Sequence, residues 1–391
     1  MLARFRSKYE AELLESVVPF WLRYSLDREF GGYFTCLDRK GQVYDTRKYL
    51  WLQGRAVWMW SRLYNEVERR PEWLEAARLG ASFVERHALD PGGRSYFSLT
   101  REGLPVHFQR KPYATAFVAQ GLLEFARATG DRSYQSEAAD LFWRIRSWIE
   151  FPGMLGRLRL DGSRPVSKLA DVMISGLLAM EFWDALADRR YWQVMDEVFE
   201  TAMRHADRNL GVFLEEAAPN GVHFYQTPEG RLFCPGHSIE VAWLLLRWLC
   251  RAPNAGRQEE VLRILEGSLE LGWDCSYGGL YYFVDVHGKP PLQLEANMKL
   301  WWPHTEAIYA VALAYVLTGD TRWAKWLEKL DEYVFGHFVD GEYGEWFGYC
   351  DRIGVRTNDC KGNHYKGMYH VPRALLFSIQ TLGVEDPCGR T

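Results

Sequence analysis

The stretch that decides the fold reads Lys361-Gly362-Asn363-His364-Tyr365-Lys366-Gly367-Met368-Tyr369-His370-Val371-Pro372-Arg373-Ala374-Leu375. A polar loop with glycine, histidine and aromatic residues runs directly into an apolar helix with proline near its start. Two earlier stretches share this pattern, Cys234-Pro235-Gly236-His237-Ser238-Ile239-Glu240 and Trp301-Trp302-Pro303-His304-Thr305-Glu306. Each places histidine or glutamate where a helix is predicted to begin. Three such junctions indicate that ionisable side chains gather where several helices start.

A glycine close to aromatic or apolar residues recurs through the chain at intervals of 58 to 67 residues. The six occurrences begin at Gly31, Gly92, Gly153, Gly211, Gly278 and Gly344. A short strand followed by a turn is the natural interpretation, so each occurrence predicts a small β-hairpin. A repeat of this length indicates six similar units.

Between these marks lie helical runs of two kinds. Some are apolar nearly all round, which is typical of helices inside a protein. These are 117–128, 172–187, 241–250 and 308–317. Others are amphipathic, with apolar residues at i, i+3 and i+4, and should cover the first kind. Clear examples are 191–202 and 261–269.

Six units with an inner helix, an outer helix and a hairpin predict an all-α fold, an (α/α)6 barrel with short β-hairpins at one end. An open solenoid of helix pairs is the alternative, disfavoured because six pairs close a ring and neither end looks like a polar cap. No linker interrupts residues 1–391, so we expect a single catalytic domain. Parallel inner helices would bring His237, Glu306 and His370 to one mouth, despite separations of 64 to 133 residues.

Composition narrows the functional classes. Apolar residues make up 48% and charged residues 25%, as in soluble globular proteins. The net charge of −4, without a basic face, argues against a nucleic-acid binder. An aromatic share of 15% fits either stacking platforms for sugars or a large aromatic core.

The cysteines and the N-terminal residues indicate the cellular compartment of the protein. Seven cysteines without a C-x-x-C pair favour reduced thiols over a disulfide framework or a zinc ribbon. The first residues do not resemble a signal peptide, and no uncharged apolar run reaches the roughly 18 residues of a membrane span. We therefore expect a soluble, cytoplasmic protein.

Several ionisable residues could carry chemistry. His237 and Glu240 are three residues apart on one helix face. A helix N-terminus lowers the pKa of a histidine, so His237 would be neutral and able to act as a base. A structural, hydrogen-bonded role is the alternative for both His237 and His370. Arg55 lies among large apolar residues, where it is either half of a structural ion pair or a clamp for a ligand.

A metal centre is not expected. His304-Thr305-Glu306 has the spacing of an H-x-E deaminase motif, but the P-C-x-x-C partner is missing. The sequence contains no H-E-x-x-H pair, P-loop or dinucleotide-binding glycine motif. His364 is interpreted as a loop residue.

Seven motifs carry a family resemblance. They are Gly31-Gly32-Tyr33-Phe34-Thr35-Cys36-Leu37-Asp38-Arg39, Val43-Tyr44-Asp45-Thr46, Trp51-Leu52-Gln53, Tyr277-Gly278-Gly279-Leu280-Tyr281-Tyr282-Phe283, Lys299-Leu300-Trp301-Trp302, Glu342-Tyr343-Gly344-Glu345-Trp346-Phe347-Gly348-Tyr349 and His370-Val371-Pro372-Arg373-Ala374. By these motifs the chain resembles the N-acylglucosamine 2-epimerases, also called renin-binding proteins, from Leu13 to about Leu382.

The resemblance implies a fold and a site. The family's fold is an (α/α)6 barrel, its two catalytic histidines correspond to His237 and His370, and its essential arginine corresponds to Arg55. Its site glutamates correspond to Glu240 and Glu306.

Two aromatic residues are further substrate contacts that the resemblance implies. They are Tyr365, where relatives often have tryptophan, and Tyr113.

The resemblance also points to a substrate class. Related cellobiose and mannose 2-epimerases and aldose–ketose isomerases carry an N-x-x-M-H pattern on the third inner helix. Here Ile174 stands in place of that histidine and the asparagine is absent, which resembles the N-acetylhexosamine branch. We therefore expect interconversion of N-acetyl-D-glucosamine and N-acetyl-D-mannosamine. A hexose or cellobiose 2-epimerase or isomerase is the alternative within enzymes.

Two other functional classes stay open at this point. An inverting glycoside hydrolase would use two carboxylates in such a barrel, although the histidine pair argues against it. A protein-binding role, as the renin-binding name implies, would not need both histidines in one cavity. The resemblance further implies ATP as a possible allosteric activator that is not consumed, no metal cofactor, no nucleic-acid or membrane partner, and a homodimer.

Overall fold

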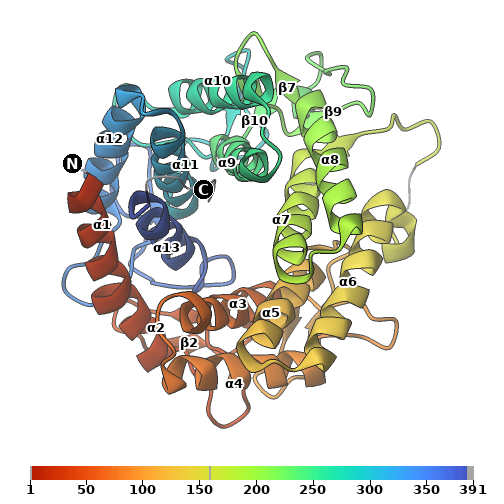
Figure 1. Cartoon of the computed structure of the whole chain (residues 1–391), viewed down its shortest axis with the longest axis vertical. Coiled ribbons are helices and arrows are strands. Elements are labelled where there is room, and N and C mark those ends of the chain that lie inside the picture. The colour runs from red at the N-terminus through yellow and green to blue at the C-terminus, as the bar shows by residue number, and fades with distance from the viewer. Residues whose placement is uncertain (1, 158–159, 385–391) are drawn as a thin grey trace.

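Two concentric rings of helices form the body of the protein (Figure 1). The computed structural model describes residues 2–157 and 160–384. The inner ring consists of α3 Leu50–Glu66, α5 Tyr113–Thr129, α7 Leu169–Leu186, α9 Pro235–Arg251, α11 Trp301–Thr318 and α13 His370–Leu382. The outer ring consists of α1 Leu2–Ala11, a π-helical segment Glu12–Val17, α2 Val18–Tyr24, α4 Pro71–His87, α6 Arg132–Glu150, α8 Arg189–Arg204, α10 Ala255–Gly272 and α12 Thr321–His337. This arrangement confirms the predicted (α/α)6 barrel.

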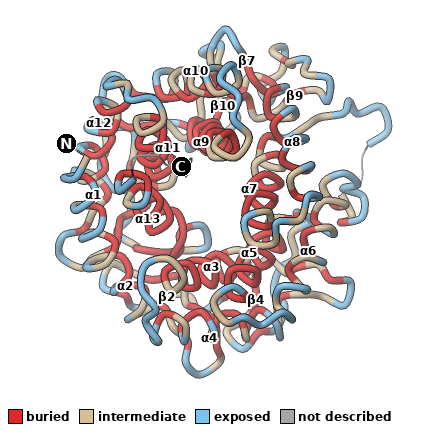
Figure 2. The backbone as a smooth tube through the Cα atoms, in the orientation of Figure 1, coloured by how far each residue is buried: buried red, intermediate tan, exposed pale blue. Residues whose placement is uncertain are grey.

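Burial distinguishes the two rings (Figure 2). Almost every residue of α11 from Trp301 to Ala314 is buried, because the outer helices surround it. By contrast, α8 buries one face, which includes Tyr191 and Val198. Apolar runs therefore mark inner helices and amphipathic runs mark outer ones, as the periodicity predicted. One continuous apolar core extends from Phe5 to Leu382.

The ring closes between its last and first inner helices. Trp58 of α3 packs edge-on against Tyr369 and against Phe377 of α13, with ring centroids 5.3 and 6.1 Å apart. α1 also packs along α13. An open solenoid would leave these apolar faces in water, so closure excludes that alternative.

The two rings differ in how their helices begin. Four outer helices start after an aspartate or asparagine whose side chain accepts a hydrogen bond from a first-turn backbone N–H. These residues are Asp131, Asp188, Asn254 and Asp320. In the described chain no side chain caps the N-terminus of α3, α5, α7, α9, α11 or α13. In the described chain, no capping side chain therefore offsets the partial positive charge at the N-terminal ends of the inner helices.

Short antiparallel strands hold the inner helices at these N-termini. The strands are β1 Cys36–Leu37, β2 Val43–Asp45, β3 Lys48–Tyr49, β4 Ser98–Leu99, β5 Pro105–His107, β6 Ser167–Lys168, β7 Ala206–Asp207, β8 Val212–Phe213, β9 Glu216–Ala217, β10 Leu232–Phe233, β11 Val284–Asp285, β12 Lys299–Leu300 and β13 Tyr349–Cys350. Local hairpins form between β1 and β2, β4 and β5, and β7 and β8.

Other strand pairs join consecutive units. β3, β6, β10 and β12 run straight into inner helices and pair with strands 50 residues or so further along, for example Lys299 with Cys350. The predicted hairpins therefore form in some units, whereas in others a strand pairs with a strand of the next unit. At Gly153 the prediction is wrong, because residues Pro152–Leu155 form a short 3₁₀ helix.

A buried ion pair recurs beneath three of the glycine turns. Lys299 Nζ lies 3.1 Å from Asp274 Oδ2 and donates to Gly279 O, and neither charged side chain is more than 1% exposed. Lys48 pairs with Asp27, and Lys361 with Asp340, in the same way. Each aspartate follows an outer helix. Lys48 and Lys299 come just before inner helices, and Lys361 begins the loop before α13. Each ion pair therefore fixes the end of an outer helix to the start of the next inner helix or to the loop before it. Hydrogen bonds and the lysine hold the pKa of Asp274 and Asp340 far below the usual range, against the opposing effect of burial.

Within the described ranges, no helix is both long and apolar enough to cross a membrane.

Removal of the lysine from one of these pairs should destabilise the barrel strongly. Lys299→Met leaves the Asp274 carboxylate buried without its main partner, and we expect a loss of about 3–5 kcal/mol in the free energy of unfolding. The matched control is Arg352→Met, which removes a second cation from the same carboxylate. Arg352 is 48% exposed, so its loss should cost about 1 kcal/mol or less. Equal losses in chemical denaturation would contradict a clamp formed by the buried lysine.

Candidate active site

One cavity of about 560 Å³ opens at the mouth where the inner helices begin. Residues from the first two turns of all six inner helices line it: Trp51 and Arg55, Tyr113 and Phe117, Ala170 and Ile174, His237 and Glu240, Trp301 and Trp302, and His370. Uncapped helix N-termini around one cavity favour negative charge that develops inside it. The cavity is therefore the candidate active site.

His370 is the first residue of α13 and belongs to a buried polar cluster. Its Nδ1 lies 2.8 Å from Oε1 of Glu306 on α11. A carboxylate accepts hydrogen bonds, so Nδ1–H donates to Glu306 and Nε2 is left as the basic nitrogen. Burial lowers the pKa of His370 well below its usual value, and the guanidinium groups of Arg55 and Arg373 lower it further.

Arg373 lies one helical turn after His370 and joins three inner helices. Its guanidinium lies 2.6 Å from Glu240 Oε1 on α9 and 2.7 Å from Glu306 Oε2 on α11. The Arg373 side chain is only 1% exposed. Buried carboxylates need such a partner, so Arg373 fixes both glutamates and, through Glu306, the ring of His370.

His237 lies in the first turn of α9, in a different electrostatic environment. Its Nδ1 lies 2.9 Å from Oε1 of Glu215. Burial opposes the charged form, but the Glu215 carboxylate and the neighbouring Cys234 outweigh it and raise the pKa of His237 well above its usual value. The expectation of a neutral His237 is therefore wrong, since the carboxylate dominates over the helix terminus.

Glu215 is a functional candidate that the sequence did not reveal. It lies between β8 and β9, where its backbone N–H donates to Leu232 O and its C=O accepts from Leu169 N, both at 2.9 Å. These bonds tie Glu215 to the strand before α9 and to the start of α7. Its only signal was its place just after the recurrent Gly211-Val212-Phe213 element.

Trp302 separates the two histidines. Its ring centroid lies 5.2 Å from that of His237 and 5.8 Å from that of His370. A Cβ at Gly236 would come within 2.4 Å of the Trp302 ring, so only glycine permits this close approach. The indole thus sets the distance across the cavity between the two imidazoles.

Arg55 faces the cavity from α3 and stacks on aromatic rings. Its guanidinium carbon lies 3.9 Å from the centroid of Phe117, 4.7 Å from that of Tyr369 and 4.9 Å from that of Trp51. It is 8% exposed, and burial lowers its pKa to about 10. No hydrogen bond or ion pair joins the guanidinium to any described residue. A structural ion pair, one of the two alternatives for Arg55, is therefore excluded within this part of the chain.

The remaining predicted residues lie at different depths. Tyr113 lines the cavity and donates to Asp171 Oδ1 at 2.8 Å. Tyr365 is 52% exposed at the rim, edge-on to Trp51. Glu240 lines the cavity, but Glu306 does not; it lies behind His370 with both carboxylate oxygens engaged. Its bonds to Arg373, Trp243 and His370 suit a residue that orients His370, and a direct substrate contact for Glu306 stays a prediction.

His304, the residue that suggested a deaminase-like motif, is structural. Its Nδ1 donates to Leu300 O at 2.6 Å, and its Nε2 accepts from Leu280 N at 2.8 Å. Burial lowers its pKa to about 3, so the ring is neutral. With both nitrogens bonded to backbone, His304 has no nitrogen left for a ligand.

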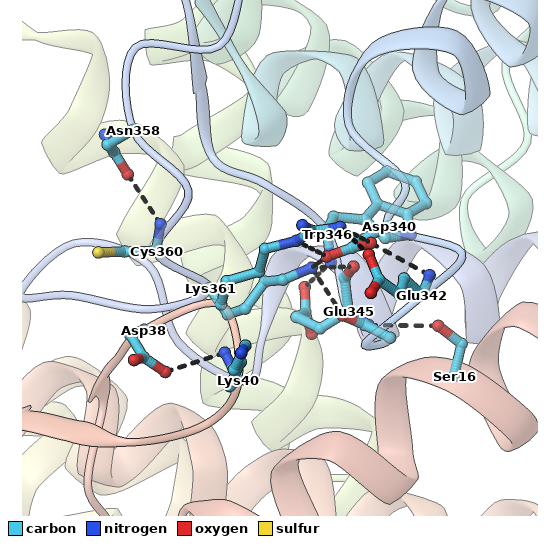
Figure 3. Close-up of polar contacts among 12 residues, drawn as sticks. Ser16, Asp38, Lys40, Asp340, Glu342, Glu345, Trp346, Asn358, Cys360 and Lys361 are labelled. Carbon is cyan, nitrogen blue, oxygen red and sulfur yellow. Dashed lines mark hydrogen bonds and ion pairs between the residues drawn. The ribbon is translucent and has the colours of Figure 1, made fainter.

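Contacts of Lys361 with the segment from Asp340 to Glu345 anchor the start of the loop that leads to Tyr369 (Figure 3). Lys361 Nζ pairs with Asp340 at 2.8 Å and donates to the carbonyls of Gly344 and Glu345. Lys366 Nζ donates to the Glu345 carboxylate and to Lys361 O, both at 2.7 Å. Two buried lysines thus fold the loop back on itself and place His370 at the start of α13.

Comparison with known proteins agrees with this geometry. A family model described as N-acylglucosamine 2-epimerase (GlcNAc 2-epimerase) matches residues 32–374. The chain belongs to this family. It is accordingly a carbohydrate 2-epimerase, an isomerase.

Two relatives and one solved structure show the extent of the similarity. The N-acylglucosamine 2-epimerase of Bos taurus is 41% identical over 382 residues, covering 95% of this chain and 90% of the relative. That of Mus musculus is 39% identical over 387 residues, covering 97% and 92%. The structure of cellobiose 2-epimerase from Bacillus thermoamylovorans B4167 has a TM-score of 0.83 at 20% identity, with 96% of this chain and 99% of that chain covered. At that identity it shows the fold alone.

Loss of Arg373 should change both stability and the charge of His370. Arg373→Met leaves two buried carboxylates unpaired, so we expect a loss of about 3–5 kcal/mol in the free energy of unfolding. Because a cation beside His370 is removed while burial and Arg55 stay, the pKa of His370 should rise above its wild-type value. NMR titration of the histidine rings, assigned with His370→Asn, measures this.

Arg373→Lys is the matched control. It keeps the positive charge, so the pKa of His370 should stay low even though the paired geometry is lost. A pKa of His370 that is unchanged from wild type in Arg373→Met would show that the arginine does not influence this histidine.

Proposed function

We propose that the chain interconverts N-acetyl-D-glucosamine and N-acetyl-D-mannosamine by moving the proton at C2. The observation that carries the proposal is the pair of histidines in one cavity, His237 and His370, each bonded through Nδ1 to a carboxylate. Relatives 39–41% identical are named N-acylglucosamine 2-epimerases, which supports the substrate class.

The chemistry needs a base on one face of C2 and an acid on the other. The open-chain aldehyde loses its C2 proton to one imidazole Nε2, and the electron pair moves towards O1 to give an enolate, since C2 carries the acetamido nitrogen. The other imidazole then delivers a proton to the opposite face of C2. Neutral His370 is ready to accept a proton, and protonated His237 is ready to donate one. The roles exchange when the reaction reverses.

Arg55 would stabilise the oxygen on which charge develops. Its guanidinium lacks a partner within the described chain and lines the same cavity as both histidines. A preorganised cation in a site shielded from water lowers the energy of an oxyanion strongly. Glu240 would bind a hydroxyl group, and Glu306 would orient His370. Trp302, Tyr113 and Tyr365 offer aromatic surface to the sugar.

The wall of the cavity beside α5 and α7 suits an acyl group. Ala114, Phe117, Ala170, Met173 and Ile174 line it, and all of these side chains are apolar. Ala170 and Ile174 occupy the asparagine and histidine places of the isomerase pattern. An N-acetyl methyl group against this wall would lose its contact with water, whereas the extra hydroxyl of a plain hexose would find no partner there.

The alternative is a hexose or cellobiose 2-epimerase or aldose–ketose isomerase of the same superfamily. ATP as an allosteric activator, a homodimer, a cytoplasmic location and independence of any metal cofactor stay predictions from the resemblance.

Substitution of either histidine should strongly slow epimerisation, and the two variants should differ in which epimer still exchanges its C2 proton. His237→Asn and His370→Asn should each lose about 10²-fold or more in turnover, the lower end of acid–base contributions. In D2O, one variant should still exchange the C2 proton of one epimer while forming almost no product. The other variant should exchange the opposite epimer. A turnover within a few-fold of wild type, with an intact circular dichroism spectrum, would make that histidine structural.

The substrate proposal is tested with a panel of sugars. N-acetylglucosamine and N-acetylmannosamine should interconvert, while mannose, glucose and cellobiose react poorly. The double variant Ala170→Asn with Ile174→His should lower kcat/KM for the N-acetyl sugars about tenfold or more, because one lost apolar contact changes discrimination by about 1–3 kcal/mol. Rapid conversion of mannose to fructose by the wild-type enzyme would favour the alternative function.

A further inference from the structure

A second feature of the cavity wall concerns a ligand that the proposed reaction does not use. A carboxylate oxygen of Glu215, the Sγ of Cys234 and an imidazole nitrogen of His237 all lie within 4.8 Å of one another. The three donors come from the segment between β8 and β9, from the residue before α9, and from the first turn of α9. Three elements thus bring one oxygen, one sulfur and one nitrogen ligand together.

This donor set matches the preferences of Zn²⁺ and its softer relative Cd²⁺. Zinc sites use cysteine thiolate, histidine nitrogen and carboxylate oxygen, and sites with three protein ligands keep a fourth position open. Magnesium and calcium prefer sites made only of oxygen ligands. A thiolate from Cys234 and a carboxylate from Glu215 would together balance the two charges of the cation.

A second group of ligand atoms, at and behind the cavity wall, provides an internal contrast. Glu240, Glu306 and His370 also present ligand atoms within 4.8 Å of one another. There, Arg373 lies 2.6 Å from Glu240 and 2.7 Å from Glu306. The arginine already compensates both carboxylates and repels a further cation. Among the described residues, by contrast, Glu215 forms an ion pair with His237 alone.

We propose that Glu215, Cys234 and His237 form a binding site for a soft divalent cation such as Zn²⁺, and that occupation of this site stops epimerisation. The cation binds the Cys234 thiolate, whose proton is released to solvent together with the extra proton of His237. It also replaces the hydrogen bond between His237 and Glu215. No oxidation or reduction takes place.

Occupation of the site blocks catalysis through His237. A metal ion on one imidazole nitrogen leaves the ring neutral, with a proton on the other nitrogen, so His237 can no longer exchange a proton with C2. His237 lines the cavity, and the side chains of His237 and Glu215 are 23% and 15% exposed, which gives the cation a path. Cys234 is buried behind them. The inhibitory consequence rests on the proposed function, whereas the binding of the cation does not.

Metal binding is measured first, without reference to activity. Purified full-length enzyme, freed of metal with a chelator, is titrated with Cd²⁺ and with Zn²⁺ in separate experiments. One equivalent of Cd²⁺ should produce a thiolate-to-cadmium charge-transfer band in the ultraviolet. Calorimetry with Zn²⁺ should give one site per chain, with release of protons that depends on the buffer. Cys234→Ser should abolish the band and weaken Zn²⁺ binding at least tenfold, about 1.4 kcal/mol.

Other thiols and the contrasting cluster serve as controls. Cys275 is exposed and Cys360 is partly exposed, so Cys275→Ser and Cys360→Ser should keep the band and the affinity. Glu240→Gln should also keep both. A band that disappears in Cys275→Ser or Cys360→Ser but persists in Cys234→Ser would overturn the proposal. So would the absence of any stoichiometric binding to wild type.

Inhibition is then measured against each variant's own metal-free rate. Zn²⁺ should stop epimerisation by wild type at the concentration at which it binds, and a chelator should restore the rate. The inhibitory concentration for Cys234→Ser should be at least tenfold higher. Unchanged inhibition in Cys234→Ser would overturn the proposal that occupation of this site stops epimerisation. If wild type binds Cd²⁺ through Cys234 but epimerises none of the sugars tested, the cation site stands and the proposed function fails.

Discussion

The interaction on which the site depends is the buried contact of one guanidinium with two carboxylates. Arg373 joins Glu240 of α9 and Glu306 of α11 to its own helix, α13, at the centre of the barrel. Each of these charges alone would be costly to bury, and the three together leave one net negative charge that hydrogen bonds from Trp243 and His370 distribute. In the opposite half of the barrel a second buried arginine, Arg62 of α3, pairs in a similar way with Glu124 of α5 and Glu181 of α7.

The Arg373 contact also explains in part why two chemically identical side chains behave differently. Burial lowers the pKa of His370, and the positive charges of Arg55 and Arg373 lower it further, against the opposing effect of the Glu240 carboxylate. Among the described residues Glu215 forms an ion pair with His237 alone, and its charge raises the pKa of His237. Burial and the placement of the arginines thus prepare an acid and a base in one cavity.

The sequence predicted features that depend on local pattern. Proline junctions located His237 and His370, apolar runs located the inner helices, and the repeat indicated the ring. What it missed depends on contacts between distant segments. Glu215 meets His237 because its backbone N–H donates to Leu232 O in the strand before α9, and Trp302 separates the histidines only because Gly236 has no side chain. Helical periodicity shows which face of a helix is buried and cannot show which residue lies opposite. The pKa of His237 was mispredicted for that reason.

Closure of the ring through α1, α13 and α3 has a consequence for how the chain is connected. Because each helix contacts its neighbours around a circle, no unit is first or last in physical terms, and the present ends lie on adjacent helices. A circular permutant opened at the turn after α11, at Gly319, with a linker between the old ends, would preserve every pairing of inner and outer helices. The barrel therefore depends on which helices are adjacent in space and not on the order of the units along the chain.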